Sequence, residues 1–566
     1  MRLRLVPVLL ALLLLAGCGA ETAQPVSAPG GQAVVPPAVP SPPAAATPVA
    51  TGPHERPLSL AIGYLRRDTL RKLAFEQWRL AELEKARRSR TVAGALRRAL
   101  LARHIGRTEH DRLRGVYERA RADAGRLPGV RGAELRAVVG SAEVLAATGK
   151  LTAGRFAPVF LTLRRNDEFW RTAPMPAPAY RKVFGRDPAV FQYYPGRGMQ
   201  LQQLASWGRV NARLGVCITP RRRHQRDLVA AIGVRGHRGP CPRKELRRSL
   251  DRLVALGARR DRFVAWEYYF SFGGGTPPWI SGMTQGTAIQ ALARASRVLK
   301  ARRYRRTAVR ALGAFRAPPP IGVSVPATGG RHYLMYSFSP SLRILNGDLQ
   351  AITGLRDLAV LGRSRAARVL FRRGERAARA AVASFDTGAW SLYSQSGRES
   401  SLGYHQLVGS FLGNLCRRTR GRTYCSAERR FARYEREPPR IHLARLTRLR
   451  AKRGTALRFS LSKLASVRVR VTGARGVTVS RTMDVSRGTY TVPWTPARRG
   501  RYRVRISAQG PSGPLGVRAE TLQVRISERA AQRLAARRRA AERRAERRQA
   551  SKPGIAPLRK ESTKRR

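Results

Sequence analysis

Residues 385–415, FDTGAWSLYSQSGRESSLGYHQLVGSFLGNL, form the stretch from which we interpret the rest of the chain. The first half is rich in Gly, Ser and Thr and contains Tyr393, a composition that is typical of a loop. From Tyr404 onward, apolar residues recur every three or four positions, which predicts an amphipathic helix. Binding residues are often carried on loops of a rigid scaffold, so the stretch predicts a polar site on a helical protein. In the alternative interpretation, both tyrosines are core residues of a structured turn.

The length and charge of the chain restrict its class. A chain of 566 residues is too long for one ordinary hydrophobic core, so it predicts two or more domains. The formal net charge of +77 indicates an acidic partner, such as nucleic acid, an anionic glycan, or an anionic membrane or wall. Basic residues are spread along the whole chain and no compact nucleic-acid-binding motif is present, which argues against nucleic acid.

The N-terminus predicts export. A short basic start precedes an apolar run, residues 5–16, that is too short to span a bilayer. The run ends in Leu-Ala-Gly-Cys, which resembles a bacterial lipobox and predicts a signal peptide over residues 1–18 with lipid on Cys18. The alternative is ordinary cleavage near Ala20. Residues 19–57 are rich in Pro and Ala and predict a disordered linker, so we expect an extracytoplasmic lipoprotein anchored to the cell membrane.

Four cysteines remain if Cys18 carries lipid, and three pairings of them are possible. Neighbours in the sequence close the shortest loops, so we predict the disulfides Cys217–Cys241 and Cys416–Cys425. The chain contains no CxxC, HExxH or His-rich spacing. We therefore expect no metal and no organic cofactor.

The central part of the chain predicts two consecutive helical regions. Residues 58–155 show apolar residues at three- and four-residue steps and predict an N-terminal helical region. Residues 156–438 alternate aromatic, Pro- and Gly-containing loops with amphipathic helices, one of which we predict over residues 199–214. Paired helices that close on themselves give an α/α toroid with its loops at one end. Such a rim suits a carbohydrate, because aromatic faces stack on sugar rings.

Three ordered segments of this part resemble a known family. They are WISGMTQGTAIQALARAS from Trp279, YSFSPSLRILNG from Tyr336, and FDTGAWSLYSQ followed by GYHQL in residues 385–407. Together they resemble the C-terminal domain of the D-glucuronyl C5-epimerase family, over about residues 156–434. The resemblance implies an α/α toroid that inverts C5 of D-glucuronate residues in a polysaccharide to give L-iduronate.

The resemblance also implies site residues. The catalytic tyrosines of the family fall on Tyr336, Tyr393 and Tyr404. Two positions depart from the family pattern: Met335 stands where an acidic residue precedes the first tyrosine, and Ser396 stands where an Arg follows the second. Both departures affect two things that the resemblance implies: which substrate is bound and whether the protein has the activity of the family.

The chemistry of C5 inversion requires one group on each face of the carbon and a cation for the carboxylate, on which charge develops. We predict Tyr336 and Tyr404 as the opposed pair, with Tyr393 in support, because nearby Arg can lower a tyrosine pKa from about 10. Core or solvated roles are the alternatives for the binding residues, with a helix cap as a further alternative for Asn346. The predicted substrate-binding residues are Arg331, Arg398, His405, Asn346, Gln285, Trp279, Tyr194 and Arg197.

Other functions remain open on the same sequence. A glycoside hydrolase needs two acids that flank the bond, and the available acids are Asp386, Glu267 and Glu399. Nothing in the sequence sets two of them opposite each other, so we rank hydrolysis below epimerisation. A uronate polysaccharide lyase shares the carbanion of an epimerase and is closer. A non-catalytic glycan- or wall-binding lipoprotein is the alternative that Met335 and Ser396 favour.

The C-terminal part changes to a period of two. Residues 439–527 alternate apolar and polar positions between Gly- and Pro-containing turns, which predicts an immunoglobulin-like β-sandwich. Residues 528–566 predict a basic helical or disordered tail that contacts anionic wall polymer or lipid headgroups. One face of the sandwich is predicted to be basic, for docking to an acidic polymer or simply as a solvated surface. Its outward residues are Arg468, Arg470, Arg503 and Arg505.

Overall fold

The computed structural model describes most of the chain beyond the predicted linker. Cys18, the linker 19–57 and the last residues of the tail lie outside the described residues. No helix within the described parts is long and apolar enough to cross a membrane. The described ranges are 67–217, 241–444, 452–498, 500–513, 517–526 and 529–550.

The chain divides into two compact units that alternate along residues 386–428. Unit 1 contains residues up to Phe385 together with 393–396 and 403–428. Unit 2 contains residues 386–392 and 397–402 and everything from Arg429 onward. The stretch from which the sequence was interpreted is therefore shared by both units.

Unit 1 begins with helices that match the predicted N-terminal helical region. In α3, Thr91 caps the first turn by accepting a hydrogen bond of 3.0 Å from the backbone N–H of Gly94. Leu96, Leu113 and Leu135 from three successive helices are fully buried, whereas Leu73 and Leu80 of α2, which the periodicity placed on an apolar face, are exposed. The helices are α2 (Arg67–Arg88), α3 (Val92–Leu101), α4 (Arg107–Arg126), α5 (Gly129–Ala147) and α6 (Ala153–Thr172).

A small antiparallel sheet corrects one prediction in unit 1. The helix predicted over residues 199–214 begins only with α7 (Gln203–Val216), and the residues before it form strand β3 (Gly198–Leu201), paired with β2 (Val190–Tyr194). Gly198 has φ +70°, and a Cβ there would lie 2.4 Å from Val138. Periodicity missed the strand because this left-handed glycine and a buried acid, described below, determine the hairpin. The third strand is β1 (Arg181–Val183).

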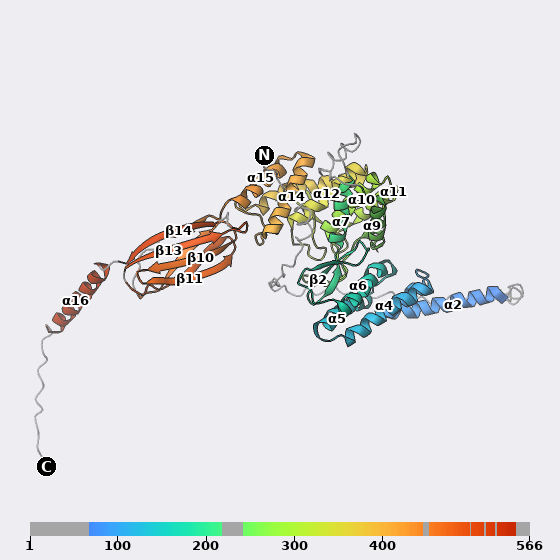
Figure 1. The fold of residues 1–566 in the computed structure, drawn as a ribbon, viewed down its shortest axis with the longest axis horizontal. Coiled ribbons are helices and arrows are strands. Elements are labelled where there is room, and N and C mark those ends of the chain that lie inside the picture. The colour runs from blue at the N-terminus through green and yellow to red at the C-terminus, as the bar shows by residue number, and fades with distance from the viewer. Residues whose placement is uncertain are drawn as a thin grey trace, which may run out of the picture. The chain divides into compact units, whose positions relative to one another are not determined.

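The centre of unit 1 is a group of closely packed helices. Figure 1 shows α10 (Gly282–Val298) beside α12 (Leu345–Leu361), and the two helices approach at Gly286 and Gly354. A Cβ on Gly354 would lie 2.0 Å from the carbonyl oxygen of Gly286, so neither position accepts a larger residue without a shift of backbone. Around this pair lie α9 (Arg243–Ala255), α11 (Arg302–Arg310), α13 (Arg365–Ala381), α14 (Leu402–Thr419) and α15 (Arg422–Arg436).

Buried polar groups join three of these helices. Asp357 of α12 is fully buried and accepts a hydrogen bond of 3.0 Å from Gln290 of α10. Its carboxylate also lies 3.1 Å from Arg294 of α10 and 3.7 Å from Arg418 of α14. Burial lowers the pKa of Arg418 to about 10. A paired internal charge of this kind fixes how the helices are arranged, because either partner alone would be strongly destabilising.

Short elements connect the helices of unit 1. The hairpin β6 (Ser324–Ala327) and β7 (Gly330–Tyr333) leads into the loop before α12. The predicted disulfides Cys217–Cys241 and Cys416–Cys425 are both formed. The helical character of this part is confirmed, and closure into an α/α toroid stays a prediction. The remaining elements are the hairpin β4 (Ala258–Arg260) and β5 (Phe263–Ala265) and the 3-10 helices η3 (Ala311–Phe315) and η4 (Val382–Phe385).

Unit 2 contains two antiparallel sheets that share one core. The four-stranded sheet has the order β11-β10-β13-β14 (Figure 1). The three-stranded sheet has the order β12-β9-β8. Alternate residues of both sheets, such as Phe459, Val469 and Val504, are buried together, as the period of two predicted. The assignment as immunoglobulin-like stays a prediction. The strands are β8 (Ile441–Leu443), β9 (Thr455–Leu461), β10 (Ala465–Gly473), β11 (Gly476–Val485), β12 (Gly488–Trp494), β13 (Gly500–Gln509) and β14 (Val517–Ile526), followed by helix α16 (Arg529–Ala550).

Candidate functional site

An aromatic cluster in unit 1 contains three of the predicted site residues, Tyr194, Trp279 and Tyr336. Trp279 stacks on Tyr268 with ring centroids 4.2 Å apart and planes 11° apart, and its Nε1 donates a hydrogen bond of 2.8 Å to the carbonyl of Phe270. The buried members of this aromatic cluster are Tyr194, Tyr268, Phe270 and Trp279, and its partly buried edge is formed by Phe272, Tyr336 and Phe338.

Tyr336 lies at the half-buried edge of the aromatic cluster. Its ring centroid is 5.8 Å from that of Trp279 and 5.4 Å from that of Phe338. Backbone contacts hold the segment against the start of α10, because Ser337 donates 2.9 Å to the carbonyl of Ile280 and its hydroxyl accepts 3.1 Å from the Ile280 N–H. The first predicted catalytic tyrosine therefore has a fixed backbone and an accessible edge.

The β2–β3 hairpin contributes a second side of the aromatic cluster. The buried carboxylate of Glu134, in α5, accepts hydrogen bonds of 2.7 Å from the backbone N–H groups of both Gly196 and Gly198. This anchor orients Tyr194, whose hydroxyl accepts 2.7 Å from Gln202, and the exposed Arg197, whose Nε donates 2.6 Å to the carbonyl of Ser271. Arg197 is thus a cation in the loops beside the aromatic cluster.

Tyr393 and Tyr404 lie in direct contact. Their ring centroids are 4.9 Å apart at an interplanar angle of 64°, and both side chains are half-buried. Ser394 forms a β-bridge with Ile344, and the N–H of Gln395 donates 3.0 Å to the carbonyl of Arg343. The segment of Tyr393 is therefore paired with the end of the loop on which Tyr336 lies, so one connected structure carries all three tyrosines.

Residues 260–433 match the family model of the D-glucuronyl C5-epimerase C-terminus. The match confirms the predicted family resemblance, over a shorter range than residues 156–434. It includes Tyr336, Tyr393 and Tyr404, and we refer to residues 260–433 as the C5-epimerase segment.

Several predicted binding residues of the C5-epimerase segment have structural partners. The amide of Gln285 is fully buried and bonds in both directions with the backbone of Trp266, at 3.1 and 2.9 Å. Arg331 donates 3.0 Å to the hydroxyl of Ser324 across the β6–β7 hairpin. His405, in α14, is completely buried. These contacts favour support of the scaffold for Gln285 and Arg331. Arg398 is exposed and belongs to the segment 397–402 of unit 2.

Asn346 has an unused acceptor. It is the second residue of α12, whose N-cap residue is Ile344, so Asn346 is not the helix cap that the alternative interpretation required. The side chain is only 2% exposed, and its Oδ1 has no hydrogen-bond partner among the described residues. A buried amide oxygen without a partner costs free energy, and such cost is expected at a site that a ligand completes.

Arg343 is a candidate that the sequence interpretation missed. The residue is half-buried, its guanidinium donates to the carbonyl of Pro340, and burial lowers its pKa. No carboxylate of the described residues lies within ion-pair distance of it, and its own carbonyl binds the backbone of Gln395, two residues after Tyr393. The sequence alone did not point to Arg343, because its place beside the Tyr393 segment depends on the pairing of two loops that are distant in the chain.

A buried pair of His332 and Asp348 was also missed. His332 Nδ1 lies 3.3 Å from Asp348 Oδ2, and Asp348 Oδ1 accepts 2.8 Å from the N–H of Tyr333. The pair connects β7 to the first turn of α12 and so fixes both ends of the loop that carries Tyr336. Sequence spacing of sixteen residues between an acid and a histidine carries no recognisable signal.

The acids that a glycosidase would need have structural partners. Glu267 is fully buried and lies 2.6 Å from Arg155 and 2.7 Å from Arg260. In unit 2, Asp386 accepts 2.8 Å from Arg430, as well as 3.0 Å from the hydroxyl of Tyr434. Burial raises the pKa of the third acid, Glu399, which accepts 2.7 Å from the N–H of Arg487. These contacts support the low rank given to hydrolysis.

The position before Tyr336 is occupied by a buried, apolar side chain. Met335 is buried between the starts of α10 and α12, where its sulfur accepts a contact of 3.4 Å from the hydroxyl of Ser281. A Cβ added at Gly347 would lie 3.2 Å from the methyl carbon of Met335. Ser396, the other departure from the family pattern, is exposed and has φ +58°.

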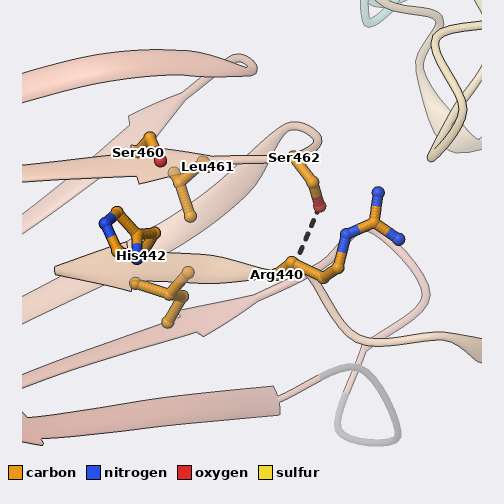
Figure 2. A pocket seen from close by; sticks show the side chains of 6 residues that line it. Arg440, His442, Ser460, Leu461 and Ser462 are labelled. Atoms are coloured by element: carbon orange, nitrogen blue, oxygen red, sulfur yellow. Dashed lines mark hydrogen bonds between the residues drawn. The ribbon is translucent and has the colours of Figure 1, made fainter.

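Two further observations concern ligands. Within the described ranges, no group of three or more His, Cys, Asp or Glu side chains has a geometry suited to a metal ion. A surface pocket of about 410 Å³ lies on unit 2, and Figure 2 shows the N–H of Arg440 bonded to the hydroxyl of Ser462 beside it, at 2.9 Å. None of the predicted site residues lines this pocket, which is formed by Arg440, Ile441, His442, Ser460, Leu461 and Ser462.

Proposed function

We propose that the chain is a polysaccharide-modifying epimerase that inverts C5 of D-glucuronate residues to give L-iduronate. The observation that carries this proposal is the family match over residues 260–433, which contains Tyr336 and Tyr393 on paired loops and Tyr404 in the first turn of α14. Tyr393 and Tyr404 are in ring contact, and Tyr336 lies on the edge of the aromatic cluster. Aromatic faces beside polar loops are suited to a sugar ring.

The proposed reaction has two proton transfers. One tyrosine, as its phenolate, removes the proton from C5, so the C–H bond breaks and the electron pair moves into the carboxylate to give an enediolate. The second tyrosine donates its phenolic proton to the opposite face of C5, so the enediolate becomes a carboxylate again, the first tyrosine is left neutral and the second is left as the phenolate. Tyr336 and Tyr404 are the proposed pair and Tyr393 the supporting residue. Proton transfer by a positioned side chain contributes about 10²–10⁴-fold to a rate.

The developing charge on the carboxylate needs a cation. We assign this role to Arg343, because it is half-buried beside the loop of Tyr393 and no carboxylate of the described residues lies within ion-pair distance of it. Arg331 is engaged with Ser324 and is less suited to it. The open acceptor of Asn346 is assigned to a substrate hydroxyl. Stabilisation of developing charge is usually the largest single contribution to such a reaction.

The setting is proposed to be extracytoplasmic, with the chain anchored to the cell membrane through lipid on Cys18. Two disulfides in unit 1 support an oxidising compartment. Cys18→Ala tests the anchor: the variant is expected in the soluble extracytoplasmic fraction and the wild type in the membrane fraction. A wild type that fractionates as soluble would contradict the anchor.

Deuterium incorporation tests the reaction. The chain from residue 58 onward is incubated in heavy water with glucuronate-containing polysaccharides, and C5 is observed by NMR. We expect label at C5 and new iduronate signals, with label reduced about 10²–10⁴-fold in Tyr336→Phe and Tyr404→Phe. Tyr180→Phe, an exposed tyrosine outside the C5-epimerase segment, is the matched control and is expected to keep full activity. Unsaturated uronate in place of iduronate would identify a lyase.

A second candidate is a non-catalytic glycan-binding lipoprotein. The observation that favours it is Met335, an apolar residue in closed packing where the family carries an acid. In this case the wild type binds uronate polysaccharide without any label at C5, and both Tyr→Phe variants bind equally well.

A further inference from the structure

Four arginines form one exposed face of the sandwich. The outward positions alternate with buried Val469 and Val504, so the side chains project from the sheet into solvent. We call the four residues the arginine face; they are Arg468 and Arg470 on β10 and Arg503 and Arg505 on β13.

The register of the sheet brings these charges together. Arg470 pairs directly with Arg505, so their Cβ atoms lie about 4.5–5.5 Å apart, and like charges in this position are destabilising. Arg468 pairs with Ser507, and Arg503 pairs with Thr472. None of the four has a carboxylate within ion-pair distance among the described residues, so no ion pair described there offsets the repulsion.

The spacing fits an extended polyanion. Alternate residues of a strand are about 7 Å apart, so the arginines extend over about 13 Å from Arg468 to Arg503. A single small anion cannot reach all four, whereas a polymer with a charge on successive units can. Arg is also the side chain that binds a carboxylate through two parallel hydrogen bonds.

The neighbouring side chains indicate which class of polyanion the arginine face binds. On β11, Thr482 lies opposite Arg468 and Ser480 lies opposite Arg470, and both are exposed. With Ser507 they place three hydroxyl groups beside the arginines, and hydroxyl groups hydrogen-bond to sugars; the exposed Asp484, opposite Ser466, lies on the same face. No aromatic ring is among these neighbours, although proteins that bind single-stranded nucleic acid depend on aromatic stacking. The chemistry therefore favours an anionic polysaccharide.

We propose that the arginine face binds a uronate polysaccharide, a choice of polymer that rests on the proposed function of the C5-epimerase segment. A second binding surface on the same chain makes engagement of the polymer partly intramolecular, which raises the overall affinity without any new contact at the reacting residue.

The test compares two double variants of the full chain. Arg470→Gln with Arg505→Gln is expected to weaken binding of a glucuronate polysaccharide about tenfold at low salt, by the loss of two charge-assisted contacts. Arg368→Gln with Arg372→Gln removes the same charge from an exposed i,i+4 pair of α13 and is the matched control. Its affinity is expected to change less than about twofold. Thermal unfolding confirms that both variants are folded.

Three outcomes would overturn the inference. Equal losses in both variants would show that only net charge matters. Equal binding of a carboxyl-reduced polymer would show that carboxylates are not recognised, and tighter binding of a polyphosphate would identify a different partner. The C5 label is measured in the same samples. A wild type that binds through the arginine face without labelling C5 overturns the proposed function alone, whereas a labelling wild type whose binding is insensitive to Arg470 and Arg505 overturns this inference alone.

Discussion

At the scale of single residues, Arg343 is the side chain on which the proposed chemistry depends most directly. Arg343→Gln removes the cation and keeps a side chain of similar shape, so kcat/KM for C5 labelling is expected to fall about 10²–10³-fold. Arg343→Lys keeps the charge and is expected to recover part of that loss. The measurement is the initial rate of deuterium incorporation over a range of polysaccharide concentrations.

Arg331→Gln is the matched control for that prediction. Its guanidinium bonds to Ser324 within a hairpin, so the substitution is expected to lower the free energy of unfolding by about 1 kcal/mol and to leave kcat/KM unchanged. A large loss of activity in Arg331→Gln, with none in Arg343→Gln, would return the carboxylate-binding role to the residue that the sequence favoured.

The sequence predicted those site features that are local in the chain. Tyr336, Tyr393 and Tyr404 could be proposed because each lies in a short motif, and the disulfides could be predicted because neighbouring cysteines close short loops. Arg343 and Asn346 are candidates because a β-bridge joins Ile344 to Ser394, and no local sequence pattern predicts that bridge. For the same reason a polar residue such as Gln285 resembles a ligand-binding residue in sequence, while its amide supports the backbone of Trp266.

At the scale of elements, Glu267 connects three parts of unit 1. Its buried carboxylate pairs with Arg155 of α6 and Arg260 of β4, and the hydroxyl of Tyr269 donates to it at 3.1 Å. Glu267→Gln leaves two buried cations without their partner, so the free energy of unfolding is expected to fall by about 3–5 kcal/mol. Denaturant titration of the full chain measures it. Loss of activity without loss of stability would instead mark Glu267 as a catalytic acid.

Lys463 gives unit 2 a pH dependence. Its ammonium is buried, lies in the turn between β9 and β10, and donates 2.6 Å to the carbonyl of Tyr434 near the end of α15. Burial lowers the pKa of Lys463 to about 8 from 10.5. Between these values the unfolded chain holds the proton that the folded chain has lost, so stability contributed by this residue rises with pH.

The expected size of that rise is about 3 kcal/mol between pH 7.5 and 10.5, because each pKa unit corresponds to about 1.4 kcal/mol. Other groups titrate in the same range, so the measured quantity is the difference in free energy of unfolding between the wild type and Lys463→Met at each pH. A difference that is constant, or that falls with rising pH, would contradict a depressed pKa.

The sequence predicted long elements better than short ones. The helices α10, α12 and α14 follow continuous apolar periodicity over four or more turns, and the strands β9, β10, β12 and β13 alternate over seven or more residues. The hairpin of β2 and β3 depends instead on Gly196, Gly198 and the carboxylate of Glu134, more than sixty residues earlier. A contact of this range overrides a local pattern and leaves no periodic signal.

At the scale of the whole molecule, the two units share the stretch between Phe385 and Tyr404. Within unit 2, the segments on either side of Tyr393 pack on the sandwich: the ring of Trp390 lies 5.1 Å from Lys463 Nζ, and Glu399 accepts 2.7 Å from the N–H of Arg487. The sandwich therefore holds residues 386–392 and 397–402, the two segments of unit 2 that flank Tyr393 in the chain.

A chain that ends at residue 438 tests this dependence. It lacks the strands that hold Trp390 and Glu399, so the loop loses its support, and misplacement of a reacting group by about 1 Å can cost 10²-fold in rate. We expect C5 labelling to fall by about that factor and the melting temperature of the remainder to fall as well. A chain that ends at residue 528 removes only α16 and the basic tail, and is expected to label C5 at the rate of the full chain. Full activity in the shorter chain would show that the sandwich acts in docking alone.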